Sequence, residues 1–578
     1  MQATSTAEIR ILVARLKQLP EGASRARVAP ICAKLGPLIT SEATFKELTV
    51  DPLALPPDEW RASSPAVSRA LSAIDDLQEV LDIERVWFNL ITWISFLYPG
   101  GGYLAPASRH IERVLRITRS LMGWKTATLH LLAQTPQLYA YIMWMWLHLP
   151  DYVSGDENYR IANFIVWLQT LVEAMFIVTG DEFDLAAANA ESIDSEPDIV
   201  YDLAAVREGL AAVNHKPRRV YRLAIRCAQK LADTVKETAV DTVTEKALEN
   251  IDIHLSVIRS LVLDVLVVGN HARDVIRSMV RLVRTLHALD PKHEVAGRAC
   301  ALLGEIWETA TDHRSMVWAL KDGIFPLMVE ICQTTPSEQW RSNIGGALIN
   351  VATRTAHLPV IRALVAHRGR ATLKQAAFID EEDLSLIDKI VERRVTLFKG
   401  SFPKECGNPE CERKDVPLRR CECKTVYYCS KACQKRHWSP HVVNCLIGVE
   451  RGLKYFGGFE IIDDASYLSH PAATFLMMLA RKQVCGLDLI EILEKDVFLV
   501  ALDFGDMPVD SEVSYVDESS KYERWQQDPT IIVTAKLGPL PSLPEDSPGA
   551  PACITAWRCV LGTLEFYRLG LTEEDIQL

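Results

Sequence analysis

The sequence has no long hydrophobic run. Its most apolar stretch, 138–149, is about twelve residues long, whereas a helix that crosses a bilayer needs roughly 18–20 apolar residues. Residues 1–22 are polar and amphipathic and lack the apolar core of a secretory signal. A surplus of basic residues is missing too, since the formal net charge is −12. These absences argue against a membrane-spanning protein and against a dedicated binder of DNA or of membrane surfaces.

Sequence motifs of common enzymes are missing as well. His293 and Glu294 are not followed by the second histidine of a zinc-protease helix, and Gly100–Gly102 lack the Lys-Ser/Thr of a phosphate-binding loop. The chain also has no Gly-x-Ser-x-Gly turn of the kind that presents a nucleophilic serine. We therefore expect that this protein is not an enzyme.

Cysteine is sparse outside one segment. Of the 14 cysteines, seven lie between 406 and 445 and seven are scattered. A secreted disulfide scaffold is small and cysteine-rich throughout, so this pattern indicates a reducing compartment, cytoplasm or nucleus, with one metal-binding cluster. We expect the scattered residues to be small core hydrophobes: Cys32, Cys227, Cys300, Cys332, Cys485, Cys553 and Cys559.

Residues 1–399 follow the period of amphipathic helices, with apolar residues at i, i+3, i+4 and i+7. The pattern is found in Ala7–Gln18, Ser108–Met122, Asn163–Thr179, Pro217–Thr238, Leu248–Val268 and His271–Leu289. Within 316–329, Asp322-Gly323 separates two apolar segments, and 343–354 and 357–367 form another pair. Stacked helical pairs of about 40 residues are typical of armadillo and HEAT repeats. We predict a mainly α fold with such a solenoid here; an irregular helical bundle is the alternative.

Charged residues form two patterns in this region. Residues 179–202 contain acidic residues and no basic ones, which predicts an exposed loop. Three predicted helices carry basic residues along one face: Arg109, Arg113, Arg116; Arg219, Arg222, Arg226, Lys230; and Arg273, Arg277, Arg281, Arg284. These faces either form a groove for an acidic peptide, dock the acidic loop, or are solvated with local ion pairs.

The C-terminal residues 449–578 have a different pattern. Segments 497–504 and 530–537 are rich in β-branched and aromatic residues, which predicts strands. The proline-rich segment 538–551 is expected to be a stiff linker that leads into a last helix over about 552–569. We predict a small α+β region.

The cysteine-rich segment contains four close pairs of metal-ligating residues. The pairs are Cys406 and Cys411, Cys421 and Cys423, Cys429 and Cys433, and His441 and Cys445, with His437 nearby. Thiolate and imidazole suit tetrahedral Zn²⁺, and two members of a pair can reach one ion across a tight turn. Four pairs supply two four-coordinate sites with no open position, which predicts a structural role for the metal.

This segment is similar to a known family. The run Cys429-Ser-Lys-Ala-Cys433-Gln434-Lys-Arg-His437-Trp438, followed by His441 and Cys445 and preceded by Val426-Tyr427-Tyr428, resembles the second half of the MYND zinc finger. In that family the ligand pairs interleave, so the resemblance implies two Zn²⁺ ions per chain. Zinc one would take Cys406, Cys411, Cys429 and Cys433, and zinc two would take Cys421, Cys423, His441 and Cys445.

The second ligand pair departs from the family pattern. Cys421 and Cys423 are separated by one residue, where the family usually has two, so their chelation of one ion is expected to be strained. His437 is an alternative ligand, although its counterpart in the family does not normally bind the metal. We therefore expect zinc one to be the more secure site.

Some family members bind short proline-rich peptides through a Gln and a Trp that correspond to Gln434 and Trp438. An exposed Trp beside an amide suits the packing of proline, while the alternative is that Trp438 covers zinc one. Seven thiolates and two Zn²⁺ would leave the finger nearly neutral, which makes a nucleic-acid partner unlikely on electrostatic grounds. The resemblance thus implies a protein partner.

Together these features predict three regions: helical repeats over 1–399, the finger over 400–448, and the α+β region over 449–578. The function that we expect is that of an interaction scaffold or adaptor, with a role in transcriptional regulation as the family suggests. The alternative is an enzyme with a divergent C-terminal catalytic region, because MYND fingers also occur in lysine methyltransferases. Residues 446–578 contain no Asn-His pair of the kind found in that catalytic domain.

Overall fold

The computed structural model describes most of the chain between 207 and 401 and shorter segments elsewhere. The described ranges are 24–39, 83–98, 134–153, 162–171, 207–238, 241–262, 266–291, 294–376, 381–401, 406–413, 418–421, 426–442, 455–456, 459–463, 470–484, 497–503, 510–515, 530–537 and 553–560. Isolated residues between 8 and 20 and at 114, 115 and 118 are also described. Contacts divide the chain into two compact units, 1–268 with 281–295 and 269–280 with 296–578, and each is described by itself.

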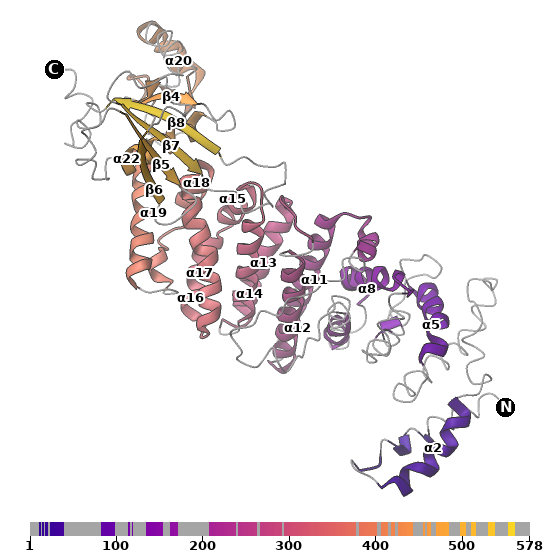
Figure 1. Cartoon of the computed structure of the whole chain (residues 1–578). Coiled ribbons are helices and arrows are strands. Elements are labelled where there is room, and N and C mark those ends of the chain that lie inside the picture. Colours follow the sequence, from indigo (N-terminus) through magenta and orange to yellow (C-terminus); the bar gives the residue numbers. More distant parts are fainter. Residues whose placement is uncertain are drawn as a thin grey trace. The chain divides into compact units, whose positions relative to one another are not determined.

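The first unit is built from helices. They include α2 (Arg25–Ile39), α5 (Ile83–Leu97), α8 (Gln137–His148), α11 (Pro217–Thr238) and α12 (Asp241–Ser260), with the 3-10 turns η2 (Leu149–Asp151) and η3 (Leu210–Val213) (Figure 1). Helix α11 begins at Pro217, as predicted, because a proline in the first turn removes no helical hydrogen bond. Its apolar face packs against α8 and α12.

Buried polar contacts fix these helices to one another. Trp146 Nε1 on α8 donates to Nδ1 of His254 on α12 at 2.9 Å, and Nε2 of the same imidazole lies 2.8 Å from the carbonyl oxygen of Ala224 on α11. The hydroxyl of Tyr221 donates to the carbonyl oxygen of Leu266 at 2.7 Å. Because buried polar groups must be paired, these bonds select one alignment of the three helices.

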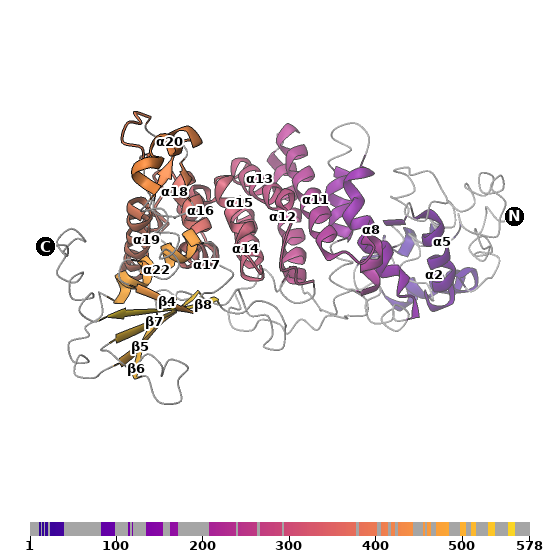
Figure 2. The ribbon, with the colours of Figure 1, turned by 90° about the horizontal axis from the view of Figure 1, so that it is seen from above.

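The second unit begins with part of α13 (Arg273–Leu289) and continues through further helices. These are α14 (Val295–Glu308), α15 (Arg314–Lys321), α16 (Ile324–Thr334), α17 (Glu338–Thr353), α18 (Leu358–His367) and α19 (Glu381–Ser401), with η5 (Arg354–Ala356) and η6 (Leu373–Gln375). Helices α15 and α18 contact each other, as do α16 and α17 (Figures 1 and 2).

The turn at Asp322-Gly323 confirms a prediction. Helix α15 ends at Lys321 and α16 begins at Ile324. Gly323 has φ 83°, a left-handed conformation that glycine adopts without steric cost. Two glycines of α14, Gly297 and Gly304, let α17 approach closely. A Cβ at Gly304 would lie only 2.9 Å from Cβ of Ala347.

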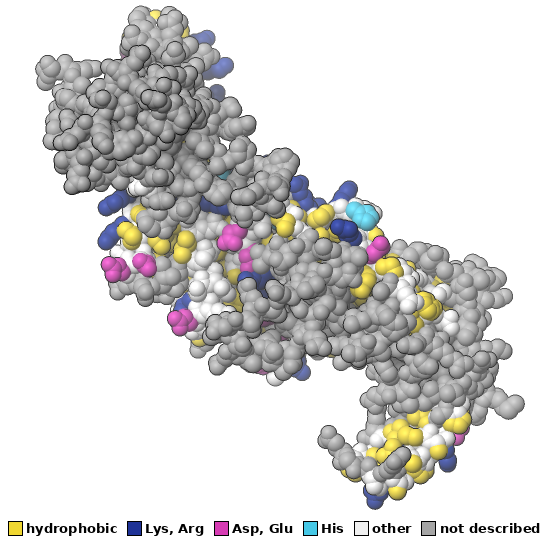
Figure 3. Space-filling view, in the orientation of Figure 1, with side chains coloured by type: hydrophobic (Ala, Val, Ile, Leu, Met, Phe, Trp, Pro, Cys, Tyr) yellow, Lys and Arg dark blue, Asp and Glu magenta, His cyan; other side chains and the backbone are white. Residues whose placement is uncertain are grey.

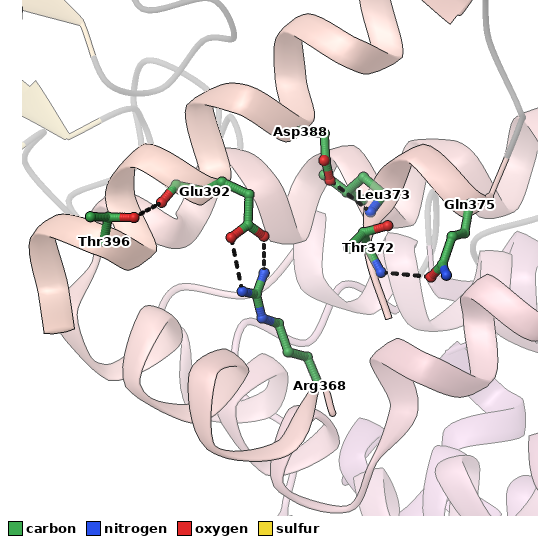
Figure 4. A network of polar contacts seen from close by, with 7 residues as sticks. All are labelled: Arg368, Thr372, Leu373, Gln375, Asp388, Glu392 and Thr396. Carbon is green, nitrogen blue, oxygen red and sulfur yellow. Dashed lines mark hydrogen bonds and ion pairs between the residues drawn. The ribbon is translucent and has the colours of Figure 1, made fainter. Parts of the chain in front are cut away.

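Side-chain hydrogen bonds connect helix α19 with the preceding elements. Buried Arg394 donates to the carbonyl oxygens of Ala352 and Thr353 at 3.2 and 3.0 Å, so it satisfies carbonyls at the end of α17. Figure 4 shows a second set of contacts, in which the guanidinium of Arg368 pairs with the carboxylate of Glu392. In the same view Asp388 accepts a hydrogen bond from the Leu373 N–H at 3.0 Å.

A six-stranded sheet lies in the C-terminal part, with strand order β3-β4-β8-β7-β5-β6 (Figure 2). Its strands are β3 (Tyr455–Phe456), β4 (Phe459–Asp463), β5 (Val497–Asp503), β6 (Asp510–Tyr515), β7 (Thr530–Leu537) and β8 (Cys553–Val560). Neighbours are antiparallel except β5 and β7, which are parallel. Helix α22 (His470–Val484) contacts β7, α18 and α19.

Most of the described helices and strands agree with the sequence predictions, and two predicted helices need correction. The described residues are mainly helical, and β5 and β7 coincide with two predicted strands. The last helix is wrong over 553–560, which form β8 between β4 and β7. The helix predicted over Leu248–Val268 is displaced: α12 runs over Asp241–Ser260, and Leu266 makes an i to i−5 hydrogen bond of π type to the Leu261 carbonyl oxygen.

Several predictions fall outside the described residues. These are the acidic loop 179–202, Arg109, Arg113 and Arg116, and the proline-rich segment 538–551. The division into three regions and the solenoid type of the helices also stay predictions. Among the described helices, none is both long enough and apolar enough to cross a membrane.

Candidate metal centre

The cysteine-rich segment folds around a two-stranded hairpin and a short helix. Strands β1 (Arg419–Arg420) and β2 (Tyr427–Tyr428) are antiparallel, and the Cys421 N–H donates to the Val426 carbonyl oxygen at 2.9 Å. Helix α20 (Lys431–Arg436) follows β2 and contacts it. Ser430 caps this helix, because its hydroxyl accepts the N–H of Cys433 at 3.2 Å.

Four cysteine sulfurs converge in this fold. The Sγ atoms of Cys406, Cys411, Cys429 and Cys433 all lie within 4.8 Å of one another. Those of Cys411 and Cys429 are 3.6 Å apart, and those of Cys429 and Cys433 are 3.4 Å apart. Sulfurs at about 2.3 Å from a tetrahedral Zn²⁺ are separated by about 3.8 Å. The four residues therefore fit one Zn²⁺, and they are the ligands predicted for zinc one.

The first cysteine pair is brought to the hairpin by a glycine. The N–H of Gly407 donates to the Tyr427 carbonyl oxygen at 2.7 Å, which places Cys406 beside β2. A Cβ at this position would lie only 2.2 Å from Cγ1 of Val426, so the close approach requires glycine. The Cys429 N–H in turn lies 3.5 Å from the Cys406 sulfur and points toward it.

Hydrogen bonding distributes protons unequally within this cluster. The Ser430 hydroxyl and the Cys429 thiol lower the pKa of Cys433, because both hydrogen-bond to its thiolate. The pKa of Cys429 is raised, chiefly because its thiol donates that hydrogen bond. Thiolate is the form that binds metal, so binding of Zn²⁺ would release the protons that these cysteines still carry.

The ligands predicted for zinc two are described only in part. Cys421 and His441 are 4% and 3% exposed, while Cys423 and Cys445 lie outside the described residues. Buried Tyr428 packs with Cys421, and its ring lies 6.0 Å from that of His441. Burial lowers the pKa of His441, and nearby His437 lowers it further, which favours the neutral imidazole that metals bind.

His437 has a partner other than a metal. Its Nδ1 lies 2.9 Å from the hydroxyl of Tyr428, and its ring stacks on that of His441 with centroids 5.9 Å apart. The hydrogen bond occupies one of the two ring nitrogens. The geometry therefore gives His437 a role in orienting Tyr428, which the sequence did not indicate.

The two residues predicted to bind peptide have different surroundings. The side chain of Trp438 is 43% exposed, and its ring lies 6.2 Å from that of His441. The amide of Gln434 instead points inward, and its Nε2 donates to the sulfur of Cys421 at 3.3 Å. Their role in peptide binding stays a prediction. The capping role of Ser430 could have been predicted, because serine before a helix is a common N-cap.

Outside the finger, Arg226, Arg277 and Arg281 are among the described residues of the predicted basic faces that form ion pairs. Arg226 pairs with Asp151 at 2.7 Å and Arg281 with Asp233 at 2.9 Å in the first unit. In the second unit Arg277 contacts Asp322 at 3.2 Å. On the face shown in Figure 3, basic and acidic side chains of the described residues are interspersed. These contacts favour solvated faces with local ion pairs over an open basic groove.

The scattered cysteines agree only partly with the prediction. Cys227, Cys300 and Cys332 are buried, and burial raises the pKa of each thiol, as expected for core residues. Cys32 is exposed, so the prediction is wrong for that residue. Within the part of the chain that the structure describes, the four finger cysteines are the one group of three or more residues placed to hold a metal.

The comparisons with known proteins identify this segment. The family model of the MYND finger matches residues 406–445. No curated protein and no solved structure matches the chain. The matched range contains the four cysteines whose sulfurs converge, and the two findings together support one zinc site.

Proposed function

We propose that this chain, which carries a MYND finger at 406–445, is an adaptor that binds a protein partner through its zinc-stabilised finger and has no catalytic activity of its own. The observation that carries the proposal is the exposure of Trp438 beside a compact metal site. Large aromatic side chains that are exposed next to polar groups are typical of peptide-binding surfaces. A proline-rich segment is the partner that this surface suits best.

The proposal includes a second Zn²⁺ held by Cys421, Cys423, His441 and Cys445. Its support is the burial of Cys421 and His441 around Tyr428. A domain this small has little apolar core, so metal binding would contribute much of its folding free energy. With two ions and seven thiolates the finger is nearly neutral, and a nearly neutral surface favours peptide over nucleic acid.

The rest of the chain would act as a scaffold. We propose that residues 1–399 form armadillo- or HEAT-like repeats, as the paired helices α15 to α18 suggest, and that 449–578 form an α+β region with the six-stranded sheet. The expected compartments are the cytoplasm and the nucleus, and recruitment of partners in transcriptional regulation is the expected role.

The test is peptide binding by the zinc-loaded, full-length protein. A library of proline-rich peptides is screened, and the affinity of the selected peptide is measured for the wild type and Trp438→Ala. Loss of the aromatic contact is expected to weaken binding at least tenfold without loss of zinc, as for a central interface residue. Phe88→Ala, which removes an exposed aromatic ring far away in sequence, serves as the control. No selected peptide, or equal binding by both variants, refutes the proposal.

A further inference from the structure

We infer that Gln434 is a positioning residue of the second zinc site, where its amide N–H donates to the thiolate of Cys421 and thereby strengthens metal binding. This inference rests on the second Zn²⁺ of the proposed function. The family resemblance implies a place for Gln434 on the peptide-binding surface, whereas the structure directs its amide nitrogen to the sulfur of Cys421, a proposed metal ligand, at 3.3 Å.

The position of Gln434 follows from the local fold. The capped start of α20 sets the helix against β2, and the Gln434 N–H bonds to the Ser430 carbonyl oxygen at 3.1 Å. Cys421 is held on the other side by its own N–H, which donates to Val426 at 2.9 Å. Helix and hairpin thus bring together two residues that are 13 positions apart, and the part-buried contact lies beside the core that Cys421 forms with Tyr428.

The hydrogen bond between Gln434 and a zinc-bound Cys421 can have only one direction. A sulfur that ligates Zn²⁺ is a thiolate, which accepts hydrogen bonds and cannot donate them. The amide nitrogen of Gln434 must therefore face it, with the amide oxygen directed away. Hydrogen bonds to an ionised acceptor are stronger than those between neutral groups. Here the bond would disperse charge on the sulfur and fix its direction, as groups behind the ligands of metal sites commonly do.

The same contact links the metal to the recognition surface. Gln434 lies four residues before Trp438, whose indole is exposed and contacts the ring of His441. Both described residues of the proposed second site thus contact residues that the family resemblance implies for peptide binding. A substitution of Gln434 is consequently expected to alter zinc binding, whether or not it also alters a peptide contact.

The experiment measures metal binding by the full-length chain with zinc as the probe. Zinc content is counted for the wild type, and a competing chelator then resolves the affinity of each ion in the wild type, Gln434→Ala and Gln434→Glu. The control is Lys431→Ala, an exposed residue of the same helix. The chain is also loaded with Co²⁺, because sulfur-to-cobalt charge-transfer bands report on hydrogen bonds to the thiolates.

The expected result is two zincs in the wild type and a 10- to 100-fold weaker affinity for one of them in both Gln434 variants. Of the two variants, Gln434→Glu should have the lower affinity for zinc, since its carboxylate repels the thiolate. The charge-transfer band should move to longer wavelength in Gln434→Ala, a change that a purely structural role would not produce. Two zincs with wild-type affinity and an unmoved band overturn the inference alone. One zinc in the wild type overturns the second site, and the inference with it.

Discussion

Buried histidines make the stability of this protein depend on pH. His254 is fully buried between α8, α11 and α12, where Nδ1 accepts from Trp146 and Nε2 donates to the Ala224 carbonyl oxygen. This arrangement needs the neutral imidazole, because a proton on Nδ1 would remove the acceptor of the Trp146 N–H. Burial accordingly lowers the pKa of His254 from 6.5 to about 4.

The sign and size of the effect follow from linkage. Between pH 6.5 and 4 the unfolded chain binds a proton at His254 and the folded chain does not, so stability falls as pH falls through this window. With pKa values of 6.5 and about 4, lowering the pH from 7.5 to 5 costs about 2 kcal/mol, which is about a 30-fold change in the opening equilibrium. Below pH 4 the loss levels off at about 3 kcal/mol.

Hydrogen exchange can resolve this loss within α11 and α12, and so avoids the assumption that the whole chain unfolds in one step. Protection factors of these helices, corrected for the intrinsic exchange rate, are compared at pH 7.5 and 5 in the wild type and His254→Gln. The variant should be less protected than the wild type at pH 7.5. On acidification to pH 5 it should lack the decrease in protection of about 30-fold that His254 causes in the wild type. His367→Gln, at an exposed position, is the matched control. An equal pH dependence in the wild type and His254→Gln would refute the reasoning.

The remaining predictions concern packing and the metal. Gly304→Val should destabilise the contact of α14 with α17 by about 1–3 kcal/mol, because Ala347 already lies at the limit of approach. Gly346→Ala, with no atom near its added methyl, should instead raise stability by up to about 1 kcal/mol; urea unfolding compares the two. Removal of zinc by a chelator should abolish exchange protection of β1, β2 and α20 while α14 to α18 stay protected, and retained protection in the finger would show that zinc does not hold its fold.

The second unit also contains buried histidines, His313 and His357, whose imidazole rings face each other. The rings of His313 and His357 lie 3.8 Å apart, and burial lowers the pKa of both, to about 4 for His313. The nearby guanidiniums of Arg354 and Arg394 lower the pKa of His357 further. Acid is therefore expected to weaken both units through the same linkage.

Local signals located many elements correctly. Pro217 marked the start of α11, and Asp322-Gly323 marked the turn between α15 and α16, because proline and glycine restrict or relax the backbone at their own positions. The segment 553–560 shows the limit of this reasoning. Its sequence predicts a helix, but pairing with β4 and β7 on its two sides makes it a strand, and β4 is far away in sequence.

The sequence by itself indicated the close pairs of metal ligands, because thiolates at such spacing suit tetrahedral Zn²⁺, and the resemblance to the MYND finger implied which two pairs share the first ion. Tertiary structure decided which polar groups are buried together. Neither the bond between Trp146 and His254 nor that between Gln434 and Cys421 has a local signal, since each joins residues of separate elements. For Gln434 the contact with Cys421 is what supports the proposed role beside a metal ligand, because hydrogen-bond partners depend on which surfaces the fold encloses.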